Sequence, residues 1–245
     1  ENTTIIFADN SPGWIMPEDF YKTKREPDIH YGIYYHHGLI GSGPHLAQAV
    51  PPSKTHEIFS LAKEKQSDYY AIMNVGNIRE FVLGIEASRD IMENAAEFDA
   101  DIWMKTWCHK NFGENGQEVF DVYKSYFSSY VVDDVHATPL LLDGLAKGRC
   151  VSNLNAIKNG LKNETPEIKS PLNTLKTDAF RKSLEKAQPG GQMTTEQWLA
   201  KALIQDSVLS ESMKQAELVV QKLNGHQKQF FETNLVAHIK FMQCL

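Results

Sequence analysis

The sequence has no excess of positive charge. Its 25 lysines and arginines are outnumbered by 31 aspartates and glutamates, which gives a formal net charge of −6. Binding to nucleic-acid phosphates requires clustered lysine and arginine, and no basic stripe runs along this chain. We therefore expect no nucleic-acid partner.

Cysteine is also scarce. The three cysteines, Cys108, Cys150 and Cys244, are far apart, and no Cys-x-x-Cys pair occurs. A disulfide framework needs a denser, even-numbered set of cysteines, and a thiolate zinc site needs closely spaced pairs. The sequence therefore predicts neither, and it allows at most one internal disulfide.

Long apolar runs are absent as well. No segment approaches the roughly 18 apolar residues of a membrane span. The opening ENTTIIFADNS has neither the basic start nor the apolar core of a signal peptide. We expect no membrane partner. Because the first residue is Glu1 and not methionine, we also expect the chain to be processed, trimmed or a segment of something longer.

What the chain does have is enough apolar material for a sizeable core, since 42% of its 245 residues are hydrophobic. In its first third, the runs at 3–9, 31–37 and 69–76 predict buried strands, and residues 51–68 predict a helix between the last two. Strand, helix, strand order implies parallel strands joined by right-handed crossovers. The fold class is therefore α/β, either an α/β barrel or a doubly wound sheet.

Polar residues follow each of these predicted strands. They are Asp9 and Asn10, then His36 and His37, then Asn74 and Asn77. In both architectures, active-site residues collect at the carboxyl ends of the strands, so these residues form a candidate site. The alternative at any single strand end is that Asn, Asp and Gly only terminate the strand.

From about residue 84 the apolar residues recur at spacings of three and four, which predicts helices. The helical patterns cover 84–98, 101–112, 116–131, 195–223 and 226–245. The polar, proline-broken stretch 160–178 predicts an exposed connection, and Thr194 or Thr195 is the expected N-cap of the helix that follows.

The segment 30–45 is unusually rich in histidine, tyrosine and glycine. Successive residues of a strand point to opposite faces, so His36 and His37 should diverge, and we expect hydrogen-bonding histidines without a metal or other cofactor. Tyrosine faces with polar rims suit the stacking of sugar rings. The tyrosines concerned are Tyr31, Tyr34 and Tyr35, with Trp14 nearby; for Tyr31 and Tyr35 the alternative is packing within the strand.

Several catalytic patterns are missing. The sequence contains no Gly-x-Ser-x-Gly, no Gly-x-Gly-x-x-Gly and no Gly-x-x-x-x-Gly-Lys. Glycosidases typically use two carboxylates on opposite sides of the scissile bond, and Asp9 is the only acidic residue at a predicted strand end. The second carboxylate is absent from this chain or lies in a loop that the sequence does not place.

Taken in order, the motifs resemble the late part of the catalytic region of glycoside hydrolase family 115, the α-glucuronidases that act on glucuronoxylan. The matching stretches are FADNSPGWI at 7–15, YGIYYHHGLIGSGP at 31–44 with the Pro-Pro pair beyond it, and NVGN at 74–77. Segments 110–127 and 215–245 are similar to helices of the bundle that follows the barrel in that family.

The resemblance implies the C-terminal part of a (β/α)8 barrel followed by an all-α helical bundle. The last three barrel strands would lie within 1–110, and the bundle within 111–245, with an irregular insertion near 160–195. The implied activity is inverting release of glucuronic or 4-O-methylglucuronic acid from xylan or a related plant polysaccharide, by a secreted or periplasmic enzyme. The expected partners are that polysaccharide and the missing upstream part of the same protein, which would carry the main catalytic carboxylates; a homodimer is an alternative.

By the same resemblance, Asp9 is the expected catalytic residue beside the reacting centre. The expected substrate-binding residues are Asn10, Trp14, Tyr34, Tyr35, His36 and Asn74. The chain has Ala8 and Asn77 where the family pattern has Asp. A non-catalytic carbohydrate-binding protein on the same scaffold is therefore an alternative function. A third interpretation makes the helical part an interaction surface and the strand-end residues simple turn formers.

Overall fold

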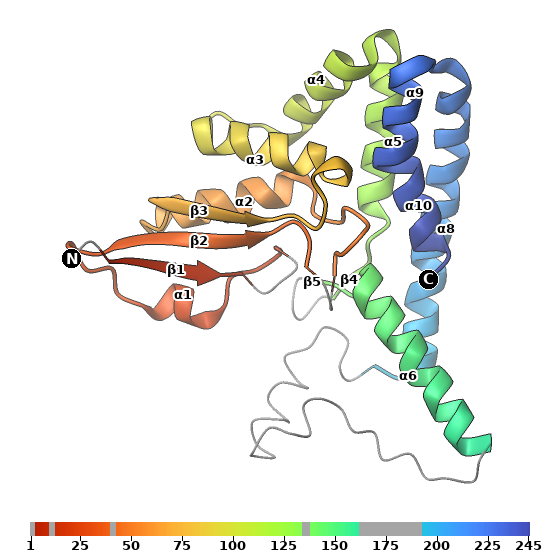
Figure 1. The fold of residues 1–245 in the computed structure, drawn as a ribbon, viewed down its shortest axis with the longest axis horizontal. Helices are drawn as coiled ribbons and strands as arrows, with labels where there is room; N and C mark the ends of the chain where they lie inside the picture. The colour runs from red at the N-terminus through yellow and green to blue at the C-terminus, as the bar shows by residue number, and fades with distance from the viewer. Residues whose placement is uncertain (1–2, 10–12, 40–42, 134–137, 162–192) are drawn as a thin grey trace.

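The computed structural model describes residues 3–9, 13–39, 43–133, 138–161 and 193–245. It is a mixed α/β structure in which a small parallel sheet lies on one side and a set of long helices on the other (Figure 1). We refer to residues 3–81 as the sheet half and to residues 82–245 as the helical half.

The sheet contains three parallel strands in the order β1-β2-β3. These strands are β1 (Thr4–Ala8), β2 (His30–His36) and β3 (Tyr70–Asn74), and the connections between them contain α1 (Glu18–Lys22) and α2 (Pro52–Glu64). The predicted strands and the predicted helix between the second and third are confirmed, as is their parallel arrangement.

The two faces of β2 lie in different surroundings. Tyr31, Ile33 and Tyr35 lie on the face packed against helices, where their exposed fractions are 4%, 1% and 0%. The ring of Tyr35 meets the ring of Phe59 in α2 edge-on, with centroids 5.2 Å apart. We call this the covered face.

The opposite face of the sheet, which we call the open face, carries Ile6 and Ala8 of β1, Gly32, Tyr34 and His36 of β2, and Tyr70, Ile72 and Asn74 of β3. Tyr70 is 55% exposed and Ile72 is 41% exposed. Neither Ile6, Tyr34 nor Ile72 belongs to any hydrophobic cluster formed by the described residues. The described residues of the sheet half therefore build a hydrophobic core on the covered face only.

A partly buried arginine secures the amino end of the covered face. The guanidinium of Arg25 lies 4.5 Å from the ring centre of Phe7, 5.2 Å from that of Phe20 and 5.0 Å from that of Tyr31. It also donates to the backbone oxygen of Lys65, at 3.0 Å, just before β3. Arg25 thereby links the connections that precede β2 and β3, at the end of the sheet opposite to the strands' carboxyl ends.

The helical half begins after a 3-10 turn, η1 (Ile78–Glu80). Its elements are α3 (Val82–Asn94), α4 (Ala100–Phe112), η2 (Gly113–Asn115), α5 (Gly116–Ser128), the short strands β4 (Val132–Asp133) and β5 (Thr138–Pro139), α6 (Asp143–Leu161), α8 (Thr195–Lys222), α9 (Gly225–Phe231), a π-helical segment η4 (Glu232–Val236) and α10 (Ala237–Gln243). Segments α9, η4 and α10 follow one another end to end, and they lie beside α5 and α8 (Figure 1).

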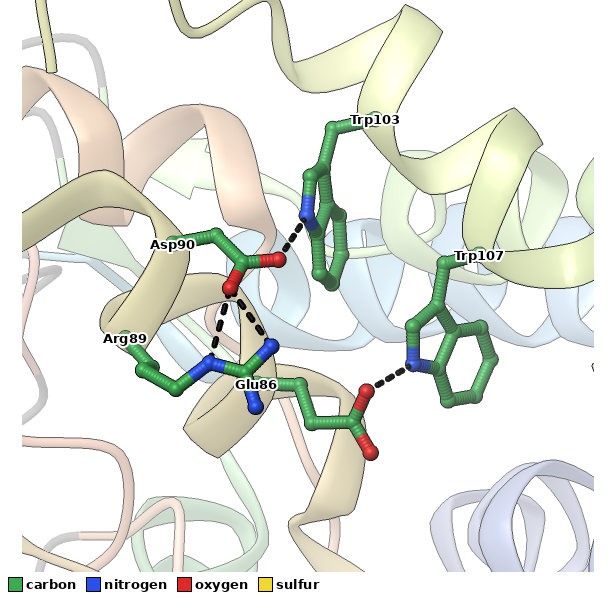
Figure 2. Close-up of polar contacts among 5 residues, drawn as sticks. All are labelled: Glu86, Arg89, Asp90, Trp103 and Trp107. Carbon is green, nitrogen blue, oxygen red and sulfur yellow. Dashed lines mark hydrogen bonds and ion pairs between the residues drawn. The ribbon is translucent and has the colours of Figure 1, made fainter. Parts of the chain in front are cut away.

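Two tryptophan indoles connect α3 and α4 (Figure 2). The indole nitrogen of Trp103 donates to Asp90 at 2.7 Å, and that of Trp107 donates to Glu86 at 3.0 Å. Asp90 also accepts from the neighbouring Arg89 at 2.6 Å. These contacts fix the first two long helices of the helical half against each other.

The helices predicted from apolar spacing are present, but α6 was not predicted. The predicted N-cap is confirmed, because Thr194 Oγ1 accepts from the Gln197 backbone and Gln197 Oε1 accepts from the Thr194 backbone. Most of the insertion expected near 160–195 lies outside the described residues. None of the helices in the described ranges combines the length and the hydrophobicity that a membrane span requires.

Candidate functional site

A buried pair formed by Asp9 and His36 occupies the carboxyl ends of β1 and β2. Asp9 Oδ2 accepts from the His36 backbone N–H at 2.7 Å, and Asp9 Oδ1 lies 2.7 Å from His36 Nδ1. The backbone N–H of Asp9 donates to the backbone oxygen of Tyr34 at 3.0 Å. The strand pairing therefore continues one residue past β1 and places the Asp9 carboxylate beside His36. Asp9 is 6% exposed and His36 is 3% exposed.

This geometry fixes the tautomer of the neutral imidazole. A carboxylate accepts hydrogen bonds, so His36 carries its proton on Nδ1 and presents the lone pair of Nε2. Within the described part of the chain, Nε2 has no hydrogen-bond partner. Asp9 thus orients His36, and Nε2 can accept a proton or a hydrogen bond from a ligand hydroxyl.

Tyr34 and Asn74 extend the site across the open face. The rings of Tyr34 and His36 lie 4.2 Å apart, as expected for residues two apart on a strand. Asn74 Nδ2 donates to the Tyr34 hydroxyl oxygen at 2.8 Å, which leaves the Tyr34 O–H as a donor and Asn74 Oδ1 as an acceptor. Together with His36 Nε2 they form a small set of donors and acceptors suited to sugar hydroxyls.

The structure does not bring Tyr35 or Trp14 to this group. Tyr35 is fully buried on the covered face, where its hydroxyl donates to Thr55 Oγ1 at 3.1 Å and burial raises its pKa far above the usual value. Trp14 is 9% exposed, belongs to the same covered core and has Lys54 Nζ 5.4 Å from its ring centre. Because side chains alternate along a strand, Tyr35 lies on the face opposite to Tyr34, and Trp14, in the connection between β1 and α1, packs into the same core as Tyr35. Their contacts with substrate remain predictions.

The remaining strand-end residues have separate roles. His37 diverges from His36 as predicted, donates through Nε2 to Ser88 Oγ at 2.8 Å beneath α3, and has its pKa lowered to about 4 by burial. The Asn77 side chain accepts from the Arg79 backbone at 3.3 Å and caps η1. Asn10 lies outside the described residues.

Sequence reasoning missed two residues that contact the connection between β2 and α2. Asp143, at the start of α6, and His238, in α10, both accept hydrogen bonds from the backbone of residues 45–48. They lie 96 to 190 positions away along the chain, so no local pattern could have identified them. No group of three or more His, Cys, Asp or Glu in the described ranges is arranged to hold a metal ion.

Comparison with known proteins places the site in a recognised segment. The family described as glycosyl hydrolase family 115 matches residues 1–133, which contain Asp9, Tyr34, His36 and Asn74. No curated protein sequence matches the chain.

Among solved structures, the chain is similar to BtGH115A, described as a novel family GH115 4-O-methyl-α-glucuronidase with specificity for decorated arabinogalactans. The TM-score is 0.61 and the identity is 15%, over 98% of this chain and 27% of that one. The likeness establishes a shared fold, and the chain spans about a quarter of the length of that protein.

Proposed function

The chain belongs to glycosyl hydrolase family 115, and from this we propose that it is part of a glycoside hydrolase releasing glucuronic or 4-O-methylglucuronic acid from xylan or a related plant polysaccharide. The observation that carries the proposal is the Asp9–His36 pair, with Tyr34 and Asn74 beside it, at the carboxyl ends of parallel strands within the matched segment. Ligand sites of parallel α/β folds occupy this end of the sheet.

The open sheet supports a partial barrel. Strands β1 and β3 are the outer strands of the described sheet, and none of the hydrophobic clusters formed by the described residues includes Ile6, Tyr34 or Ile72 of the open face. In a (β/α)8 barrel that face would point inward, and further strands would pair with both edges. We propose that residues 1–110 hold the last three barrel strands, that 111–245 form a helical bundle, and that upstream sequence of the same protein completes the barrel.

Catalysis then depends on groups from both parts of the protein. Glycoside hydrolysis uses two carboxylates, and Asp9 already binds His36 through both oxygens. Asp9 therefore works through His36, which takes part in proton transfer or in positioning water or a sugar hydroxyl. The upstream strands supply the general acid and base of an inverting reaction. Tyr34, Asn74 and Asn10 bind the sugar.

The cellular setting follows from the substrate. A plant polysaccharide is too large to enter a cell, so the enzyme would act as a secreted or periplasmic protein. Neither nucleic acid nor membrane is expected as a partner. A homodimer is compatible with this function, although the proposed site does not require one.

The proposal is tested with the longer protein on 4-O-methylglucuronoxylan, following the released acid by proton NMR. The α-linked sugar should appear first as the β anomer, which is the signature of inversion. His36→Ala should lower kcat/KM by about 10²–10⁴-fold, the usual contribution of a group acting in proton transfer. The matched control is His30→Ala, on the same strand and the same face but at the other end, where His30 stacks on Tyr69.

Release of the α anomer first would rule out inversion, and equal activity of both variants would rule out the role of His36. The alternative is a carbohydrate-binding protein without catalysis, favoured by the engagement of both Asp9 oxygens and by the use of Asn77 as a cap. In that case calorimetry would show binding of 4-O-methylglucuronic acid to the wild type and weaker binding to His36→Ala, with no release of acid.

A further inference from the structure

Side chains of the helical half bind four consecutive backbone amides of the sheet half. The Asp143 carboxylate lies 2.8 Å, 2.6 Å and 3.2 Å from the first three nitrogens, and His238 Nδ1 lies 3.3 Å from the fourth. The donors, in order, are His45, Leu46, Ala47 and Gln48.

Asp143 and His238 are both buried where they contact residues 45–48. Asp143 and His238 are each 3% exposed. No ion pair among the described residues involves Asp143, so its buried charge is balanced by these amides and by the Gly144 N–H at 2.8 Å. Because an amide N–H can only donate, His238 must accept through an unprotonated Nδ1.

The local sequence is adapted to the carboxylate. Gly43 has a φ of +86°, a conformation that favours glycine, and a Cβ at this position would lie 2.4 Å from Asp143 Oδ1. A side chain on Gly43 would therefore clash with the acceptor. Glycine at 43 and aspartate at 143 thus fit each other across a long sequence separation.

The same segment lies against the strand ends that carry the candidate site. The Asn74 backbone oxygen accepts from His37 at 2.8 Å and from Gly38 at 3.1 Å, which joins the ends of β2 and β3. Next to this junction, a Cβ on Gly76 would lie 2.7 Å from the His45 oxygen. Residues 45–48 thus pack against Gly76, which lies two residues beyond Asn74. The junction between the ends of β2 and β3 begins at His37, directly after His36.

We propose that Asp143 and His238 are positioning residues for the candidate site, acting through residues 43–48 to hold the ends of β2 and β3 in place. The inference rests on the proposed function because it concerns the same site. Neither residue touches the sugar in this arrangement; the helical half determines how firmly the sugar-binding groups are held.

The test combines hydrogen exchange with kinetics in the longer protein. Asp143→Asn keeps the side-chain size but replaces one acceptor oxygen with a donor. Exchange of the amides in 45–47 should accelerate at least about tenfold, as expected for the loss of charge-assisted bonds. On glucuronoxylan, kcat/KM should fall about 10–100-fold, mostly through KM, because the sugar-binding groups lose their alignment.

His238 provides a second, milder pair of variants. His238→Leu removes the acceptor and should free the Gln48 amide, whereas His238→Asn places an oxygen near the former Nδ1 and should restore both amide protection and KM. This pair decides the matter even if Asp143→Asn fails to fold. The matched control is Asp99→Asn, since Asp99 also accepts a backbone N–H at a helix start, from Ile102 at 2.8 Å, but at the surface and with no hydrogen bond to residues 43–48 among the described contacts.

The outcomes separate cleanly. Faster exchange with unchanged KM and kcat would show that the contacts are only structural and would overturn the positioning role. Unchanged exchange of the amides at 45–48 in the variants would show that Asp143 and His238 do not restrain this segment. A wild-type protein that releases no uronic acid would refute the proposed function, and with it the positioning role, while the exchange data would still show whether the two side chains hold the segment.

Discussion

The two faces of β2 differ in what covers them and in what their tyrosines bind. On the covered face, Tyr35 is fully buried and bonded to α2, whereas one residue earlier Tyr34 lies partly exposed on the open face and bonds to Asn74. Two adjacent tyrosines therefore serve different purposes, one in packing and one in a ligand site. The comparison shows that the described chain completes its core on one side of the sheet and leaves the other side for additional structure and a ligand.

Replacing each tyrosine in turn tests this comparison most strongly. Tyr35→Ala should lower the free energy of unfolding by about 3–5 kcal/mol, because it removes a large, fully buried ring. Tyr34→Ala should cost less than about 1 kcal/mol but weaken binding of the uronic acid. Urea denaturation followed by circular dichroism measures both losses, and equal losses would contradict the difference between the faces.

Stability in acid should depend on the buried His37. Burial lowers the folded-state pKa of His37 to about 4 from 6.5, so the neutral ring is favoured in the folded protein. The unfolded chain binds the proton more readily, so stability is complete above pH 6.5 and falls as the pH drops from about 6.5 to about 4. The loss should be on the order of 2–3 kcal/mol for His37.

His238 should add a similar acid sensitivity, because burial also lowers its pKa to about 4. Denaturation curves at pH 7 and pH 4.5 should therefore converge when His37→Gln and His238→Asn are combined. His30→Ala, which removes an exposed histidine at the start of β2, serves as the matched control. A wild-type protein with equal stability at both pH values would contradict the burial of neutral imidazoles.

The smallest effect is expected at the amino end of the covered face. Arg25→Lys keeps the charge but loses the planar fork that bonds to Lys65 and faces three aromatic rings, so it should cost about 1–2 kcal/mol. Lys22→Ala, which breaks an exposed pair with Glu18, should change stability by less than about 0.5 kcal/mol. Thermal unfolding compares the two variants, and equal shifts in Tm would show that Arg25 contributes no more than a surface charge.

The local features of the fold could be predicted from the sequence because their causes are local. Apolar runs ended by polar residues predict the three strands, and a threonine N-cap at 194 or 195 predicts the start of α8, where the structure has Thr194. Helix α6 was not predicted because glycines at 144, 148 and 160 interrupt its sequence, although Val151, Leu154 and Ile157 recur at a spacing of three.

The candidate site could be predicted only in part. Asp9 and His36 were assigned from strand ends and family resemblance, and the structure brings them together. Of the two interpretations of Tyr35, packing within the strand agrees with its burial, because the two-residue period of a strand turns it away from Tyr34. The contacts of Asp143 and His238 with residues 45–48 depend on tertiary packing, and nothing in either local sequence encodes the partner.

The hydrogen bond between Gln48 and His238 also has a consequence for synthesis of the protein. The two residues are 190 positions apart, so His238 is made roughly 10–40 s after Gln48 at typical rates of translation. During that interval the strands of the sheet half can pair, but the segment that follows β2 lacks its final acceptors. The candidate site is therefore complete only after both early and late parts of the chain have been synthesised. A ribosome that stops before α10 leaves the segment after β2 without its hydrogen bond to His238.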